Sequence, residues 1–208
     1  MSVAVPRGDS VVVMHDVEWS EYERLRDDPD HDHVRMTYDR GVLTFTPPSR
    51  SHDQISRMLQ LMVYEWAKLR PVPLASCDAA TQREPERRIG LEPDECFYIQ
   101  KQSPTGGLDQ ADWDSPRPPD LAIEVEVSNP FRGRLPLYAT LCVPEVWHWR
   151  VEALTVYRLV DNAYVAVPES VLLPGFPLGE AQRLLLALDD ELEMTLISRF
   201  EVHIRSLP

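Results

Sequence analysis

Cysteine is scarce in this chain of 208 residues, and long apolar runs are absent. The three cysteines, Cys77, Cys96 and Cys142, lie far apart and show no C-x-x-C spacing. Neither a disulfide framework nor a zinc site is therefore indicated, and we expect reduced, packed thiols. No apolar stretch reaches the length of a bilayer, and the N-terminus lacks the basic-then-apolar layout of a secretory signal. We expect a cytoplasmic protein that does not bind membranes.

Positive charge is also scarce, because 21 Lys and Arg stand against 34 Asp and Glu, for a formal net charge of −13. A protein that coats or stores nucleic acid normally presents clustered Lys and Arg to the phosphates, and no such cluster is present. The acidic balance does not exclude a DNA enzyme whose own divalent cations neutralise the local site. It argues against tight, sequence-independent DNA storage.

Several common catalytic signatures are missing too. The sequence has no Ser-His-Asp nucleophile elbow, no Gly-rich phosphate loop and no H-E-x-x-H helix. The stretch DDPDHDH at residues 27–33 mixes carboxylates with imidazoles, but Pro29 and the local polarity favour a solvated loop over a metal site. His148, between two tryptophans in an expected strand, is more typical of a structural role.

The length and the 43% hydrophobic content suit one domain over residues 1–208. Strands and helices alternate irregularly, which predicts an α/β fold with a mixed sheet flanked by helices. Periodicity and turn residues predict the following elements: a strand near 11–14, a helix opened by Ser20 and ended by Asp28, a hairpin at 34–46, a long amphipathic helix from Ser51 to Pro71, strands at 74–82 and 95–100, a loop at 101–119, a strand at 121–127, a helix starting near Pro136, a strand at 145–150, a hairpin around Asp161-Asn162, and one or two helices after Leu178.

The strand in PPDLAIEVEVSNP, residues 118–130, carries the chemistry. Apolar residues alternate with polar ones, so Glu124 and Glu126 share one face about 7 Å apart. Two carboxylates on one face of a sheet repel each other unless a partner or a cation compensates them. Asp94, at the start of an earlier strand, could add a third oxygen donor, and such hard ligands suit Mg²⁺ or Mn²⁺. The alternative is a solvated sheet face whose acids only confer solubility.

The sequence also resembles a known family. The succession GVLTFTPPSRSHDQIS, EPDECFYIQ, PPDLAIEVEVS and RLPLYATLCVPEVWHW followed by LTVYRL, over roughly residues 16–200, is similar to the Uma2 family of the PD-(D/E)XK nuclease superfamily. The resemblance implies a restriction-endonuclease-like core, with a mixed central sheet and helices on both faces. It also implies an Mg²⁺-dependent phosphodiesterase that acts on DNA.

By position, the resemblance assigns Asp94 and Glu124 as metal ligands. The superfamily lysine falls where this chain has Glu126, and a second lysine slot holds Arg134, four residues before Tyr138. Glu126 could therefore act as general base or as a ligand of a second metal ion, and Arg134 could neutralise the phosphate. His52, near the start of the long helix, could contact substrate or water, although such a histidine is more often only a surface residue.

Two functional hypotheses follow. The first is a DNA endonuclease with Asp94, Glu124 and Glu126 as catalytic residues, Mg²⁺ (or Mn²⁺) as cofactor, and Arg134 and His52 as substrate contacts. The second is a catalytically silent relative that uses the same fold to bind a partner or to self-associate. A homodimer is expected, because Trp147 and Trp149 could bury an interface between two copies.

Overall fold

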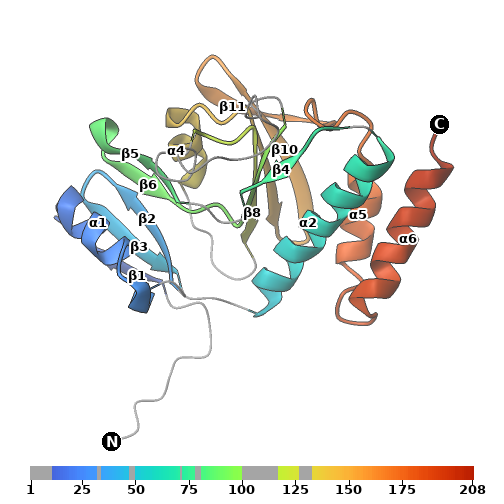
Figure 1. Cartoon of the computed structure of the whole chain (residues 1–208), viewed down its shortest axis with the longest axis horizontal. Helices are drawn as coiled ribbons and strands as arrows, with labels where there is room; N and C mark the ends of the chain where they lie inside the picture. Colours follow the sequence, from blue (N-terminus) through green and yellow to red (C-terminus); the bar gives the residue numbers. More distant parts are fainter. Residues whose placement is uncertain are drawn as a thin grey trace, which may run out of the picture.

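The structure is a computed structural model that describes residues 11–31, 34–46, 50–70, 72–77, 81–99, 117–126 and 133–208. Two sheets and several helices make up the described part of the chain (Figure 1). The smaller sheet and helix α1 lie at one end, and the paired helices α5 and α6 lie at the other end. The larger sheet stands between them.

The smaller sheet has the strand order β1-β3-β2-β6-β5, and neighbouring strands are antiparallel. Its central hairpin turns at Arg40-Gly41, which both have positive φ. Helix α1 packs on it through Tyr22, whose ring stacks on Tyr38 at a centroid distance of 5.0 Å. The bounds are β1 Val12–Met14, α1 Trp19–Arg26, β2 Arg35–Asp39, β3 Val42–Thr46, β5 Gln82–Glu84 and β6 Ile89–Leu91, with short 3-10 turns at Pro29–His31 and Pro85–Arg87.

The larger sheet has the order β11-β10-β9-β8-β7-β4. Its ladders are antiparallel except between β8 and β9, which run parallel, so the sheet is mixed. The β10–β11 hairpin turns at Asp161-Asn162, both with positive φ, as a two-residue hairpin turn requires. The bounds are β4 Ala75–Ser76, β7 Glu95–Tyr98, β8 Leu121–Glu126, β9 Glu145–Arg150, β10 Ala153–Val160 and β11 Ala163–Val167.

Both faces of the larger sheet are covered. On one face α2, Arg50–Leu69, packs with α5, Leu178–Leu185, and α6, Glu193–Ser206, against Leu121, Ile123 and Val125 of β8. On the other face α4, Arg134–Thr140, and strand β6 pack against Ala122 and Val146. The expected mixed α/β fold with helices on both faces is confirmed.

Most expected elements are present, with three differences. Helix α1 begins at Trp19 after Glu18, so Ser20 is not its cap, and no side chain caps this helix. The strand expected at 74–82 is two short strands, β4 and β5, in different sheets. Strand β6 was not anticipated because its three residues are too few to show a period. The loop expected at 101–119 lies mostly outside the described residues, as does Val127.

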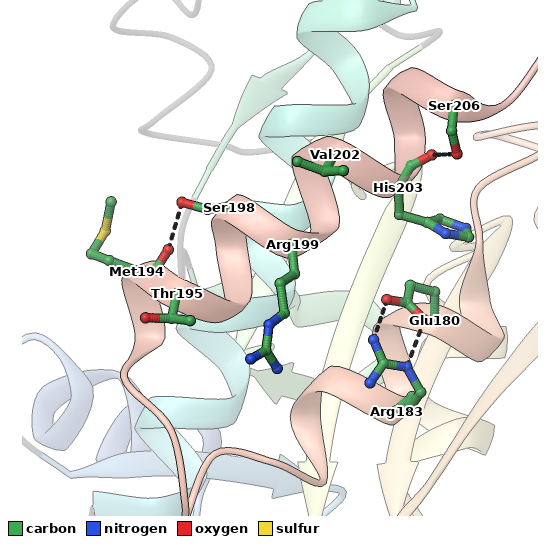
Figure 2. Close-up of a pocket in the computed structure, with 9 residues that line it drawn as sticks. All are labelled: Glu180, Arg183, Met194, Thr195, Ser198, Arg199, Val202, His203 and Ser206. Atoms are coloured by element: carbon green, nitrogen blue, oxygen red, sulfur yellow. Dashed lines mark hydrogen bonds and ion pairs between the residues drawn. The ribbon is translucent and has the colours of Figure 1, made fainter.

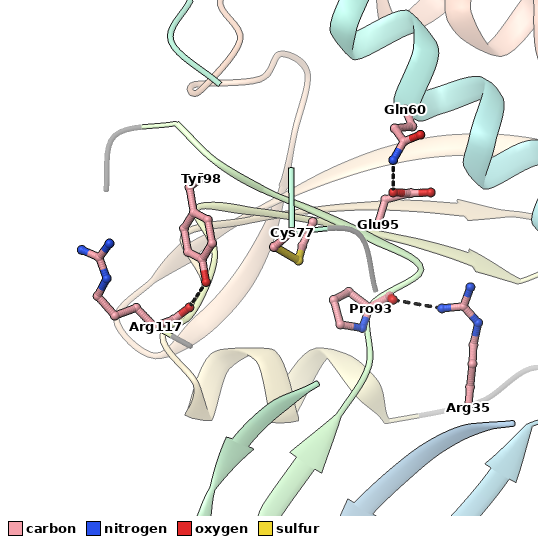
Figure 3. The surroundings of a disulfide bond; sticks show 8 residues. Arg35, Gln60, Cys77, Pro93, Glu95, Tyr98 and Arg117 are labelled. Atoms are coloured by element: carbon pink, nitrogen blue, oxygen red, sulfur yellow. Dashed lines mark hydrogen bonds between the residues drawn. A yellow bond between two sulfur atoms is a disulfide. The ribbon is translucent and has the colours of Figure 1, made fainter. Parts of the chain in front are cut away.

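The expectation of three reduced thiols is wrong for two of the cysteines. Cys77 and Cys96 form a disulfide (Figure 3). Cys142 is free and exposed. The cause is sheet register: β4 pairs antiparallel with β7, with Ser76 opposite Phe97, so the next residue along β4 faces Cys96 at a Cα separation of 5.5 Å. Figure 3 also shows that Gln60 of α2 donates to Glu95 of β7.

The tryptophans expected at an interface are core residues. Trp147 is fully buried and Trp149 is 4% exposed, and both pack in the cluster beneath α2, α5 and α6. They cannot form a dimer interface without unfolding that cluster. None of the helices in the described part of the chain is both long and apolar enough to cross a membrane.

Candidate functional site

Asp94 and Glu124 meet at the end of the β7–β8 ladder. Glu95 is paired with Ile123, and the backbone N–H of Asp94 donates to the Ile123 carbonyl at 3.1 Å. The side chain of Asp94 then accepts a hydrogen bond from the backbone N–H of Val125 at 2.7 Å. The two carboxylates are therefore neighbours across one ladder, and both are buried.

Asp94 is surrounded by cations. His52 Nε2 of α2 lies 2.9 Å from its Oδ2, and Arg35 Nη1 of β2 lies 3.1 Å from its Oδ1. Burial alone would raise the pKa of Asp94, but the hydrogen bond and charge of His52, with Arg35 and Arg134, lower it. For His52, burial alone would lower the pKa, and Asp94 raises it above its ordinary value. Asp94 is therefore ionised and paired at neutral pH.

Glu124 is held by two groups of α4. Arg134 Nη1 donates to Glu124 Oε2 at 2.7 Å, and the Tyr138 hydroxyl donates to Oε1. Burial raises the pKa of Glu124 to about 7, against the lowering effect of Arg134, and the charge of Asp94 raises it further. Burial and the neighbouring Glu124 charge likewise raise the pKa of Tyr138 well above its usual range. Glu124 can thus gain or lose a proton near neutral pH.

Arg134 begins α4, directly after Gly133. Gly133 has φ 137°, a conformation that favours glycine, and it sets the direction in which α4 starts. The guanidinium also donates to the backbone carbonyl of Glu92, while its Nε makes no hydrogen bond with any described residue. Burial alone would lower the pKa of Arg134, but the Glu124 charge raises it, so the side chain stays cationic.

Glu126 lies on the same face of β8 as Glu124 but contacts different residues. Its Oε2 lies 3.3 Å from His148 Nε2 and 3.2 Å from Arg150 Nε, both on β9. These residues, with Glu124, Arg134, Tyr138, Thr155 and Tyr157, line a cavity of about 630 Å³. A cavity of this size accommodates a nucleotide-sized ligand. The sheet thus places Glu124 and Glu126 on one wall of one cavity, as the alternation predicts.

A second hollow lies far from the acids in the fold. It is an open groove of about 760 Å³ between α5 and α6 (Figure 2). Arg183 and Arg199 point into it, but they pair with Glu180 and Glu191. None of the carboxylates predicted from the sequence contributes to this groove, so the cavity beside β8 is the candidate site.

The carboxylate oxygens of Asp94 and Glu124 are suitable ligands for a hard divalent cation. Mg²⁺ is commonly held by one or two carboxylates, with waters and substrate phosphates completing the shell. Asp94 and Glu124 supply such a pair, and the buried Asp94 Oδ1 makes an ion pair with Arg35 but no hydrogen bond with a described residue. Among the residues that the structure describes, no group of three or more His, Cys, Asp or Glu is arranged to hold a metal. An ion at this site would therefore depend on those two carboxylates.

Sequence reasoning assigned His52 and Arg134 to the site but missed its other basic residues and its tyrosine. Arg35 comes from β2 of the other sheet, Tyr138 from α4 and His148 with Arg150 from β9. No local pattern links these positions to Glu124, because they converge only through sheet order and helix docking. The one available signal was Tyr138, four residues after Arg134 in the family-like block.

The mixed sheet that presents this carboxylate pair beside buried basic side chains has a similar solved structure. The chain is similar in structure to the protein described as "a putative nuclease belonging to DUF820 from Anabaena variabilis", with a TM-score of 0.53 and 14% identity, over 89% of this chain and 99% of that one. The model of the Uma2 family, described as "Putative restriction endonuclease", matches residues 19–196. The chain belongs to the Uma2 family. No curated protein shows significant similarity to it.

Proposed function

We propose that this protein is an endonuclease that depends on Mg²⁺ or Mn²⁺ and hydrolyses DNA phosphodiester bonds at Asp94, Glu124 and Glu126. One observation carries the proposal: Asp94 and Glu124 are buried neighbours across one ladder, and Glu124 opens onto a cavity of about 630 Å³. Buried acids paired in this way, with perturbed pKa values, are typical of catalytic sites.

Asp94 and Glu124 would hold the ion, which would supply Lewis acidity at a phosphate oxygen when bound. His52 and the Val125 N–H fix the Asp94 carboxylate, so that residue is orientated before substrate arrives. His52 then acts through Asp94, in addition to the substrate contact expected from the sequence.

Glu126 is placed to accept a proton from a water in the cavity, because its carboxylate faces that space and is kept in position by His148 and Arg150. Arg134 lines the same cavity and can neutralise the charge of a phosphate. Arginine is a suitable group for that purpose, since its planar fork matches two phosphate oxygens.

The test is cleavage of supercoiled plasmid and of labelled oligonucleotides by the purified protein, with Mg²⁺ or Mn²⁺ and with a chelator as blank. Asp94→Asn and Glu124→Gln should each lower the cleavage rate by at least a hundredfold. Glu180→Gln, on α5 and away from the cavity, should cleave like the wild type, so a loss in the other two variants is specific to the site and not due to a contaminating nuclease. Equal rates in all four proteins would remove the assignment.

A second candidate is a catalytically silent module with the nuclease fold, which binds a partner or pairs with itself. The observation in its favour is that Arg35, His52 and Arg134 already neutralise Asp94 and Glu124. This candidate predicts no cleavage and no heat in a titration with Mg²⁺. Sizing chromatography tests the expected homodimer, for which the buried tryptophans of β9 give no support.

A further inference from the structure

Arg134 occupies the position at which an added cation would approach Glu124. Its Nη1 lies 2.7 Å from Glu124 Oε2, and the other oxygen of that carboxylate accepts from Tyr138. Both oxygens of the proposed ligand are therefore engaged by α4. The same guanidinium is also held by the Glu92 carbonyl, and its side chain is only 17% exposed.

Both carboxylates of the pair are already compensated. Asp94 contacts Arg35 and the His52 ring, and Glu124 contacts Arg134. Adding a divalent ion while these basic groups stay in place would bring two further positive charges into a buried region whose acids are already paired, which is strongly unfavourable. One of the cations must leave its carboxylate if an ion is to bind.

Arg134 is the cation that can move away from its carboxylate. It lines the cavity of about 630 Å³, whereas Arg35 and His52 do not, so Arg134 has open space beside it. Arg35 and Arg134 are each also bound to a backbone carbonyl, so access to the cavity is what distinguishes the two arginines. A charged hydrogen bond contributes enough to make its displacement measurable in an affinity.

We infer that Arg134 is the internal counter-cation of this site and competes with a divalent ion for Glu124. The inference rests on the proposed function, since it takes Asp94 and Glu124 as the ion's ligands. Ion binding is then an exchange, in which Arg134 leaves Glu124 and stays in the cavity, where a substrate phosphate can receive it. The position of Arg134 thus sets the cation affinity of the resting protein.

The experiment measures Mn²⁺ binding by electron paramagnetic resonance of the free ion, at pH 8 and without DNA. Arg134→Met keeps the length of the side chain and removes the charge, and it should lower the Kd for Mn²⁺ at least tenfold. Arg199→Met is the matched control, because Arg199 lines the groove between α5 and α6 and pairs with Glu191, and its Kd should stay within about twofold of the wild type.

Arg134→Lys serves if the methionine variant fails to fold, as judged by circular dichroism. One ammonium cannot hold Glu124 and the Glu92 carbonyl in the way the guanidinium fork does, so this variant should also bind Mn²⁺ more tightly than the wild type. In the wild type, titration with Mg²⁺ should shift the Arg134 Nε–H resonance, assigned by its loss in the lysine variant.

The outcomes separate the two proposals. Tighter binding in the Arg134 variants than in the wild type and the control supports the inference, whether or not the wild type cleaves DNA. Equal affinity in wild type and variants overturns the inference, and Mn²⁺-dependent cleavage would still support the nuclease. No binding in any of the proteins overturns the inference, because then Arg134 is not what excludes the ion.

Discussion

Replacing Glu124 by Gln should change how stability depends on pH. Burial raises the pKa of this carboxyl in the folded protein to about 7, from an ordinary value of 4.5. A raised pKa stabilises the fold below pH 4.5, and this contribution is lost as the pH rises through 7. At about 1.4 kcal/mol per pH unit, the loss is about 3 kcal/mol. Gln resembles the protonated carboxyl and does not ionise. The variant should therefore retain the unfolding free energy that the wild type loses as the pH rises.

Urea denaturation followed by circular dichroism between pH 5 and pH 8.5 is the assay. The two proteins should differ little at pH 5, and by pH 8 the variant should be more stable by about 3 kcal/mol, which is a difference of roughly 6–12 °C in Tm for a chain of this size. Glu201→Gln, an exposed residue of α6 beside Arg205, should follow the wild-type profile. Parallel profiles for Glu124→Gln and wild type would refute the reasoning, and so would a variant that is less stable at pH 8.

Other substitutions test the surroundings of the site. Asp94→Asn should destabilise the protein at pH 7 by about 3–5 kcal/mol in urea, because it leaves buried cations unpaired. Since the pKa of Asp94 is lowered from 3.8, the effect should persist down to that pH and shrink only as the pH falls below it. Gly90→Ala should lower stability by about 1–3 kcal/mol, since a Cβ there would overlap the Tyr22 ring, and an unchanged Tm would contradict this packing. Reducing the Cys77–Cys96 disulfide, which closes a 19-residue separation, should destabilise by about 3 kcal/mol, and thiol titration of the denatured, unreduced protein should find one free thiol instead of three.

Local sequence patterns were sufficient to predict β8, the strand that carries Glu124 and Glu126. Alternation in β8 placed Glu124 and Glu126 on one face, and the structure puts both on the wall of one cavity. The spacing of apolar residues predicted α2 almost to its ends, and Asp161-Asn162 predicted the last hairpin. These features depend on residues that are near each other in the chain, and their physical causes are local.

The partners of the acids could not be predicted in the same way. Arg35 reaches Asp94 from another sheet, and the Cys77–Cys96 bond depends on the register between β4 and β7. Such contacts follow from how elements dock, and a single sequence does not show docking. The tryptophans of β9 were misjudged for a related reason, because an apolar strand looks the same whether a helix or a second subunit covers it.

Backbone hydrogen bonds fix the spacing between Asp94 and Glu124. Their main chains are joined by ladder bonds such as that from the Asp94 N–H to the Ile123 carbonyl, so no loop can bring the two acids closer or move them apart. Changes elsewhere in the protein can therefore leave this distance untouched while they alter which basic groups face it. Single substitutions at positions such as Arg134 can then change the charge that faces the two acids, without redesign of the scaffold.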